Sequence, residues 1–309
     1  MRRNPYGVLV LSLLGISIAG PLVRLSSADP VAIAAWRLGF SLVIVGGFLI
    51  GTRQWRDWKK ITRRETALAA AGGICLALHF WAWNASIHLT TIAASVTLVN
   101  LQPAVVAAIS AVALREAPSR RQVFGIAVAI AGAFVIAAPD FRGGLAHGGN
   151  HALLGNLLAV SAAVTAAIYY TIGRHLRAGL GIWAYVAIVY SAALITLLAI
   201  ALSRGVALAP QPPREIAIFA ALAIGPMLIG HTGMNWALKF LPAYVVNLTA
   251  LGEPVGATLL GAFIPAIRQI PTIATLAGGA IVLTGVVIAA DTGQQRKRLI
   301  IKFPRDRLP

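Results

Sequence analysis

The chain has 309 residues, of which 58% are hydrophobic and only 11% are charged, and its mean hydropathy is +0.81. Soluble domains carry about 25% charged residues, so this composition excludes a protein whose whole surface faces water. The net charge of +17 does not indicate nucleic-acid binding, because the basic residues lie in short connectors between apolar stretches. The composition therefore predicts a polytopic membrane protein.

In chain order, windows of about 20 apolar residues predict ten membrane-spanning helices. The first stretch is longer than a signal-peptide core and lacks a clear cleavage site, so it is expected to be retained. Residues 140–150 and 205–214 are rich in glycine or proline and are predicted to be loops. The single cysteine, Cys75, excludes an intrachain disulfide. The predicted spans are approximately 5–24, 31–51, 66–87, 91–114, 122–138, 152–173, 182–202, 216–238, 243–264 and 271–290.

Lysine and arginine are distributed unequally between the two sides that these spans define. With a cytoplasmic N-terminus, the segments on that side hold twenty Lys and Arg residues, and the opposite connectors hold five. This difference follows the positive-inside rule and predicts a multi-pass protein with both termini in the cytoplasm. The basic tail, residues 296–309, is expected to lie against anionic lipid headgroups of the bilayer.

Sequence landmarks recur between the two halves of the chain at offsets of 151 to 153 residues. Each half holds five predicted spans, an odd number, so the second half must enter the membrane in the opposite direction. We therefore expect an all-α membrane protein with two inverted five-helix repeats, residues 1–145 and 146–295, before the tail. The matched landmarks include His79 with His231 and Arg24 with Arg177.

A polar residue stands next to a proline near the middle of one span in each half. Gln102 precedes Pro103 in the fourth span, and Glu253 precedes Pro254 in the ninth. Proline lacks a backbone donor and crowds the preceding turn, so both helices are expected to bend or break there. Paired breaks of this kind are the best sequence indication of a transporter's binding site, and we predict that Pro103 and Pro254 shape or gate it.

Several short motifs, in their order and spacing, resemble one known family. The stretches 237–243 (ALKFLPA) and 251–255 (LGEPV) resemble the second repeat of the EamA-type family in the drug/metabolite transporter superfamily. The first-repeat motifs are Ala35-Trp-Arg-Leu38, Leu101-Gln-Pro103 and Leu114-Arg-Glu116 followed by Gly125.

The resemblance covers nearly the whole chain and implies a ten-helix inverted-repeat carrier in the inner or plasma membrane. Members of this family commonly export amino acids and other small metabolites. The resemblance also implies a central cavity lined by spans one, three, four, six, eight and nine. One stretch departs from the family pattern: residues 263–268 (FIPAIR) stand where the family usually repeats the Gly-Glu found near Glu116.

Polar and aromatic side chains within the spans are the candidates for lining a cavity, because polar groups at membrane depth usually face the bundle or water. Glu253 is the only acidic residue deep within a span. It either binds a proton or a substrate amine, or it bonds backbone groups freed by Pro254 and holds the broken helix in shape. The candidate cavity residues are His79, Trp83, Asn100, Gln102, Tyr169, His231, Asn235 and Glu253.

The two histidines and one intramembrane arginine have alternative roles. His79 and His231 either take part in proton coupling with Glu253 or serve as interhelical hydrogen-bonding groups. Arg37 lies six or seven residues inside the second span. One possible role is to neutralise an acid such as Glu253. The favoured expectation is that Arg37 either extends its long stem to the outer interface or forms structural hydrogen bonds.

Small residues in two outer spans predict a close approach of helices, either inside one protomer or between two, and a homo-oligomer is left open. They are Gly125, Ala129 and Gly132 in span five, and Gly278, Gly279 and Gly285 in span ten.

Together these patterns predict a secondary active transporter that exports amino acids or similar small organic metabolites by alternating access. A proton gradient is the first hypothesis for its driving force, since the chain has no Gly-rich nucleotide-binding loop. No cofactor is expected, and no metal, because neither a carboxylate nor a cysteine stands at ligand spacing from the histidines. The alternatives are a channel or receptor-like membrane protein and, with least support, an intramembrane enzyme.

Overall fold

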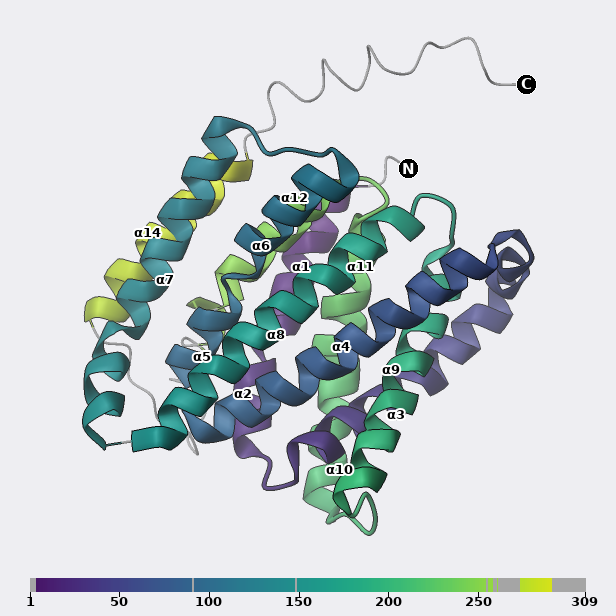
Figure 1. The fold of residues 1–309 in the computed structure, drawn as a ribbon, viewed down its shortest axis with the longest axis horizontal. Helices are drawn as coiled ribbons and strands as arrows, with labels where there is room; N and C mark the ends of the chain where they lie inside the picture. The colour runs from purple at the N-terminus through teal and green to yellow at the C-terminus, as the bar shows by residue number, and fades with distance from the viewer. Residues whose placement is uncertain are drawn as a thin grey trace.

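The computed structural model describes residues 4–90, 92–147, 149–253, 255–257, 260 and 273–290 (Figure 1). All regular secondary structure in these ranges is helical. Seven helical segments of the described residues are long and apolar enough to cross a membrane. They are Pro5–Leu25, Pro30–Gly51, Arg63–Leu89, Ala94–Leu114, His151–Leu176, Ile182–Arg204 and Pro213–Ala237.

Several of these segments consist of shorter helices that follow one another directly. In the first half the elements are α1 (Pro5–Ser17), α2 (Ala19–Leu25), α3 (Pro30–Gly51), the 3-10 helix η1 (Gln54–Lys60), α4 (Arg63–Leu89), α5 (Ile92–Val99), α6 (Gln102–Ile109), the π-helix η2 (Ser110–Leu114) and α7 (Arg120–His147). In the second half they are α8 (Gly149–Leu176), α9 (Ile182–Arg204), α10 (Pro213–Leu222), the π-helix η3 (Ala223–Thr232), α11 (Gly233–Ala237), α12 (Ala243–Leu248), the 3-10 helix η4 (Thr249–Gly252) and α14 (Ile273–Ala290).

Local sequence signals account for where helices begin and end. The side chain of Asp29 accepts a hydrogen bond from the backbone N–H of Val31 at the start of α3. Pro30, the first residue of this helix, has no backbone N–H and therefore leaves no donor unpaired there. Thr62 and Glu65 form a reciprocal capping box at the start of α4. Gly205 ends α9 at a φ of 65°, a left-handed conformation that glycine adopts without strain.

The two loops predicted from glycine and proline have different outcomes. Residues 206–212 are non-helical, as predicted, between the end of α9 and the start of α10. The loop predicted at 140–150 is wrong, because the described residues of this stretch are helical up to His147 and again from Gly149. Each glycine in a helix costs only about 1 kcal/mol, which a long continuous helix can tolerate.

The helix breaks lie partly where the sequence places them. Helix α5 ends at Val99 and α6 begins at Gln102, so the chain is interrupted directly before Pro103. Pro254, the matched proline, lies outside the described residues. A further irregularity, the π-helix η3, contains Pro226, a position that the sequence analysis did not single out.

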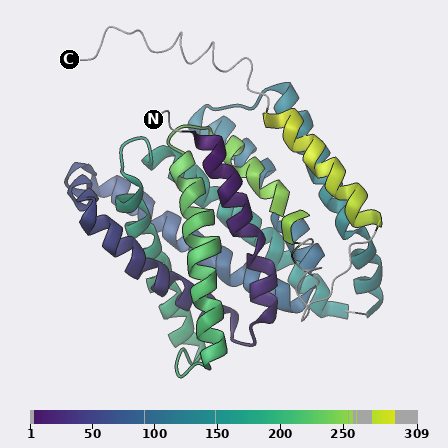
Figure 2. The same cartoon turned by 180° about the vertical axis from the view of Figure 1, so that it is seen from behind.

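The two halves of the chain interlock. Helix α4 packs against α8 and α9, α3 packs against α9, and α1 packs against η3 and α11. Helix α6 similarly contacts α8 and α12. Figures 1 and 2 show α1 and the continuous α10–η3–α11 rod side by side on one face of the bundle, with α4 and α8 on the other. Because these contacts join first-half helices to second-half helices, the centre of the molecule is built by both halves.

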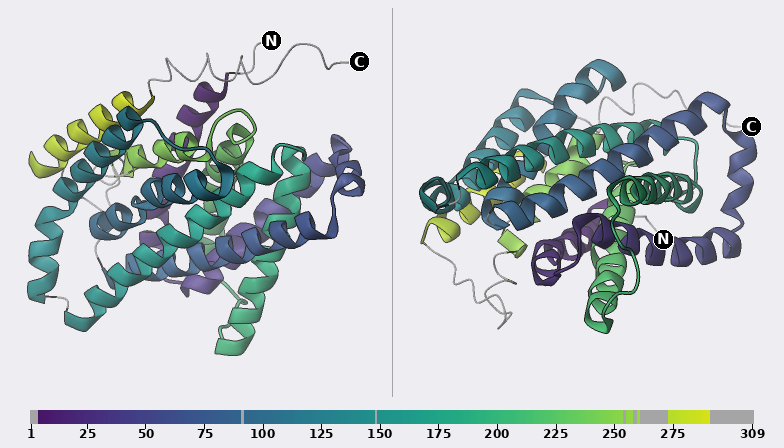
Figure 3. Two further views of the ribbon diagram at one scale, coloured as in Figure 1. Left: turned by 45° about the horizontal axis from the view of Figure 1, so that its top comes forward. Right: turned by 60° about the horizontal axis from the view of Figure 1, so that its bottom comes forward.

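Helices α7 and α14 form a separate pair at the edge of the bundle, as Figures 1 and 3 show. A Cβ atom added at Gly125 would lie 2.7 Å from the backbone nitrogen of Ala289, and one at Gly285 would lie 2.4 Å from that of Ala129. The backbones can approach this closely only because these positions carry no side chain. The sequence left open whether these small residues pack helices within one protomer or between two. The structure shows such a contact within one protomer.

Two matched arginines make equivalent contacts in the two halves. Arg24, at the end of α2, donates a hydrogen bond of 2.8 Å to the carbonyl of Ile87, close to the C-terminus of α4. Arg177, beyond the end of α8, donates one of 3.1 Å to the carbonyl of Asn235, close to the C-terminus of α11. Cations at helix C-termini bond the free carbonyls and oppose the helix dipole. The landmark found in the sequence is thus a repeated structural contact.

Replacing Arg177 with glutamine is expected to lower the free energy of unfolding by about 1–3 kcal/mol, because Arg177 is buried and its carbonyl partners would lose their donor. The matched Arg24→Gln should cost less than about 1 kcal/mol, since Arg24 is exposed and water can replace it. Thermal unfolding of both variants in detergent measures the difference, and an equal effect would contradict the prediction.

Candidate functional site

A cavity lies at the centre of the bundle between helices of both halves. It contains about 500 Å³ of empty space, counting the part that is open to solvent. Its walls come from spans one, three, four, six, eight and nine, as the resemblance implies, and additionally from span two through Arg37. The lining residues are Ile16, Ala19, Arg37, His79, Phe80, Trp83, Val99, Asn100, Gln102, Tyr170, Pro226, His231, Met234, Ala250 and Glu253.

The two matched histidines meet at this cavity. The ring centroids of His79 and His231 lie 6.0 Å apart, and Phe80 packs edge-on against His231 with a centroid distance of 5.1 Å. Tyr170 also stacks on His231, with the two ring centroids 6.1 Å apart and the ring planes only 13° from parallel. Residues at matched positions in the two halves of the chain therefore approach each other at the centre of the molecule.

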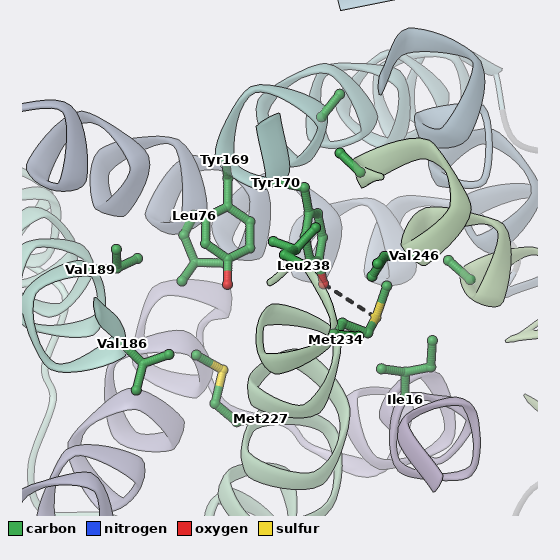
Figure 4. Close-up of a cluster of buried hydrophobic side chains, with 14 of the residues drawn as sticks. Ile16, Leu76, Tyr169, Tyr170, Val186, Val189, Met227, Met234, Leu238 and Val246 are labelled. Atoms are coloured by element: carbon green, nitrogen blue, oxygen red, sulfur yellow. Dashed lines mark hydrogen bonds between the residues drawn. The ribbon is translucent and has the colours of Figure 1, made fainter. Parts of the chain in front are cut away.

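The hydrogen bonds of His79 determine its tautomer. Its Nδ1 lies 2.9 Å from the carbonyl oxygen of Ala162, which can only accept, so Nδ1 carries the hydrogen and donates it. In the neutral ring, Nε2 is then an acceptor. His231 pairs through Nδ1 with the hydroxyl of Tyr170 at 2.9 Å, and that hydroxyl donates toward the sulfur of Met234, as Figure 4 shows.

Arg37 is the residue whose environment differs most from the sequence-based expectation. One half of the favoured interpretation, with the stem extended to the outer interface, is wrong: the side chain is only 1% exposed and lines the cavity. Helix α3 packs against α4, α9 and η3, so this face of the helix is enclosed by protein. The guanidinium carbon lies 3.9 Å from the ring centroid of Phe80, and NH2 lies 3.9 Å from the sulfur of Met227.

Glu253 follows η4 and is 8% exposed on the wall of the same cavity. Arg37 lies on the wall of the same cavity. The cavity therefore contains one basic and one acidic side chain together with two imidazoles. Such a set can bind a solute that carries both charges, and it can take up or release a proton.

Amide side chains join α6 and α12 across the centre. Gln102, at the start of α6, donates a hydrogen bond from Nε2 to Oδ1 of Asn247 in α12. The Nδ2 of Asn247 donates to the carbonyl of Ala243 at 2.8 Å, and Asn100 bonds back to Val96 at 2.7 Å. Asn247 was not among the sequence-based candidates, although its position one and a half turns before Glu253 in an apolar run was an available signal.

Two of the sequence-based candidates do not line the cavity, which corrects the predicted set. Tyr169 and Asn235 are fully buried and are hydrogen-bonded to each other, with Asn235 as the donor. Adjacent residues on a helix point about 100° apart. Tyr169 accordingly lies in the apolar cluster with Leu76 and Val189, and Tyr170 lines the cavity (Figure 4).

At the end of the bundle where α1 begins, polar contacts join the two halves. Arg174 of α8 binds Glu116 through Nε and NH2, at 3.0 and 2.7 Å from the same carboxylate oxygen. Asp57 of η1 accepts a hydrogen bond of 3.0 Å from the backbone of Gly181. A hydrogen bond from Lys60 holds the pKa of Asp57 below its ordinary value, assisted by the Gly181 contact. These contacts join Glu116 and Asp57, in connecting segments of the first half, to Arg174 and Gly181 of the second half.

The opposite end of the bundle is joined around Glu215 at the start of α10. Its carboxylate accepts hydrogen bonds from the hydroxyl of Ser26 and from the backbone and hydroxyl of Ser27, at 3.1 and 3.0 Å for the last two. Arg214 additionally donates to the carbonyl of Leu25 at 2.8 Å. The central cavity is thus flanked at both ends of the bundle by polar contacts between the halves.

Apolar helices of membrane-crossing length around a central polar cavity define the class of a membrane transporter. A model of the EamA-like transporter family matches residues 5–138 and again residues 153–290, so the chain belongs to this family. The resemblance drawn from the short motifs is confirmed, and each half of the chain holds one copy of the family pattern.

Two known proteins are similar to this chain over most of its length. An uncharacterized transporter from Archaeoglobus fulgidus is 25% identical over 295 residues, which cover 91% of this chain and 95% of the relative. A solved crystal structure, titled only as that of a protein, has a TM-score of 0.73 at 17% identity and covers 94% of this chain and 98% of that chain. At this identity the likeness shows a shared fold.

Proposed function

We propose that this protein is a secondary active transporter that exports amino acids or similar small organic metabolites by alternating access. The observation that carries the proposal is the central cavity whose polar wall is supplied by both halves of the chain. Binding at midplane between repeats, beside interrupted helices, is how many secondary transporters hold a solute.

The proposed architecture is ten membrane-spanning helices in two inverted repeats, residues 1–145 and 146–295, with residues 296–309 as a basic tail. Both termini lie on the cytoplasmic side of the inner or plasma membrane. The excess of lysine and arginine on one side supports this orientation. The start of α1 and the end of α14 at the same end of the bundle also support it (Figure 1).

In the proposed cycle, the two halves rock about the cavity. The contacts of Glu116 with Arg174 and of Glu215 with Ser26 and Ser27 lie at opposite ends of the bundle and join the halves there. Opening either end requires its own set of contacts to separate. The hydrogen bond between Gln102 and Asn247 is the corresponding contact at the centre. Proton coupling would use Glu253, His79 or His231, which all lie on the cavity wall.

Counterflow in proteoliposomes tests the proposal. Vesicles loaded with an unlabelled solute are expected to accumulate the labelled solute transiently, with saturation. A channel shows no such counterflow, and an enzyme would release a chemically changed product. A panel of amino acids and amines identifies the solute.

Gln102→Leu is expected to reduce counterflow at least about tenfold, because Asn247 would lose its partner at the centre of the bundle. Gln211→Leu is the matched control, since that side chain bonds only to loop carbonyls at one end of the molecule. An unchanged counterflow rate in Gln102→Leu, with folded protein, would contradict a central role for this contact.

A further inference from the structure

The cavity wall holds buried hydrogen-bond donors without partners. Among the described residues, eight buried side-chain nitrogen or oxygen atoms lack a hydrogen-bond partner. Three of these atoms belong to residues that line the cavity: Nε and NH1 of Arg37 and Nε1 of Trp83. All three are N–H donors, and neither group can act as an acceptor. The unpaired groups on the wall are therefore donors that need a hydrogen-bond acceptor.

Nothing on the described wall fills this capacity. The face of Phe80 and the sulfur of Met227 are weak partners for a guanidinium and leave Nε and NH1 unused. A buried arginine retains its charge, so an unpaired guanidinium at membrane depth is unfavourable unless a partner arrives. Carboxylates are the natural partner, because their two oxygens match the planar fork of the guanidinium.

We propose that Arg37, assisted by Trp83, is the subsite that binds the carboxylate of the transported solute. This inference rests on the proposed transport function and narrows its substrate class to solutes that carry a carboxylate. The acceptor Nε2 of His79 is on the same wall and remains for an ammonium group of that solute. The arrangement fits a zwitterion such as an α-amino acid.

The competing interpretation assigns Arg37 to Glu253 as a permanent internal counter-ion. The two groups line the same cavity, yet the Nε and NH1 hydrogens of Arg37 have no acceptor. Under that interpretation, removing the carboxylate from a solute would not weaken its binding. The two interpretations therefore differ in a measurable selectivity of the wild-type protein.

The experiment measures thermal stabilisation of the purified full-length protein by the standard L-amino acids, each compared with its own carboxamide and its decarboxylated amine. At least one amino acid is expected to stabilise the wild type, and its carboxamide and amine should need at least tenfold higher concentrations. Arg37→Gln should abolish this preference, Arg37→Lys should retain part of it, and Trp83→Phe should weaken it a few-fold. Arg204→Gln is the matched control, since Arg204 is exposed and is not part of the cavity.

The wild-type comparison needs no variant, so a failure of Arg37→Gln to fold leaves the proposal falsifiable. Equal stabilisation by carboxamides or amines, no stabilisation by any amino acid, or an unchanged preference in a folded Arg37→Gln protein would overturn it. Counterflow with the same solutes separates the two proposals. Counterflow of amines or neutral solutes without preference refutes the subsite and leaves transport standing. Carboxylate-selective stabilisation without counterflow supports the subsite and refutes transport.

Discussion

Glu253→Gln is expected to abolish solute accumulation driven by a pH gradient and to leave solute counterflow largely intact. The glutamine amide keeps the size and hydrogen-bonding capacity of the side chain but cannot take up or release a proton. Gradient-driven accumulation in proteoliposomes should fall at least about tenfold, to the level seen without a gradient. The physical basis is the position of Glu253 as a buried carboxyl group on the wall of the central cavity.

The groups around Glu253 define the alternatives. Arg37 has a fixed positive charge, and His79 and His231 are the imidazoles on the described wall. A gradient response that survives Glu253→Gln but is lost in His231→Gln would refute the assignment to Glu253 and give the proton to the histidine. If Glu253 only held the broken helix in shape, counterflow would fall together with accumulation.

Glu65→Gln is the matched control for this experiment. Glu65 lies in the exposed capping box at the start of α4, where a glutamine can still bond the backbone of Thr62. This variant removes one carboxylate from the protein without touching the cavity. Its gradient-driven accumulation should equal that of the wild type, and unchanged accumulation in Glu253→Gln as well would exclude proton coupling through Glu253.

Gly285→Leu is expected to destabilise the protein strongly by forcing α7 and α14 apart. A Cβ atom at this position would lie 2.4 Å from the backbone nitrogen of Ala129 and 2.6 Å from the backbone oxygen of Gly125. Backbone atoms cannot turn aside as a flexible side chain can, so the two helices must separate. Overpacking a well-packed interior costs about 1–3 kcal/mol of stability. Because the added side chain meets backbone atoms, we expect Gly285→Leu to cost an amount at or above the upper end of that range.

Gly46→Leu is the matched control for the same substitution. Gly46 lies in α3, and a Cβ atom added there would have nothing within 4 Å. Thermal unfolding and size-exclusion profiles in detergent should show a lowered melting temperature or aggregation for Gly285→Leu and little change for Gly46→Leu. Equal stability of the two variants would contradict a tight contact between α7 and α14.

The membrane class and much of the helical organisation could be predicted from the sequence alone. Apolar stretches of membrane-crossing length, the interruption before Pro103 and the family motifs are all local patterns, and local patterns can be read along the chain. The matched histidines were visible as a landmark at a fixed offset, and the structure places their rings 6.0 Å apart. Pro254, the second predicted break, lies outside the described residues.

The errors in the candidate site concern features that depend on which face of a helix is enclosed. Tyr169 and Tyr170 are neighbours in the sequence, and only the packing of α8 against its neighbours decides which one lines the cavity. Arg37 was expected either to extend to the interface or to form structural hydrogen bonds, and the first of these is wrong because packed helices enclose the side chain. Asn247 became relevant through its bond with Gln102, which lies 145 residues away in the chain.

Composition, span lengths, proline positions and internal repetition determined the kind of protein and the interruption before Pro103. The physical reason is that a bilayer imposes backbone hydrogen bonding within each span, so hydropathy and helix-breaking residues act locally. Only the tertiary structure decided that Gly125 and Gly285 meet within one protomer, and that Arg37 lies on a cavity wall with two of its donors unpaired. Such contacts depend on the rotation of each helix about its axis, which is set by all of its neighbours together.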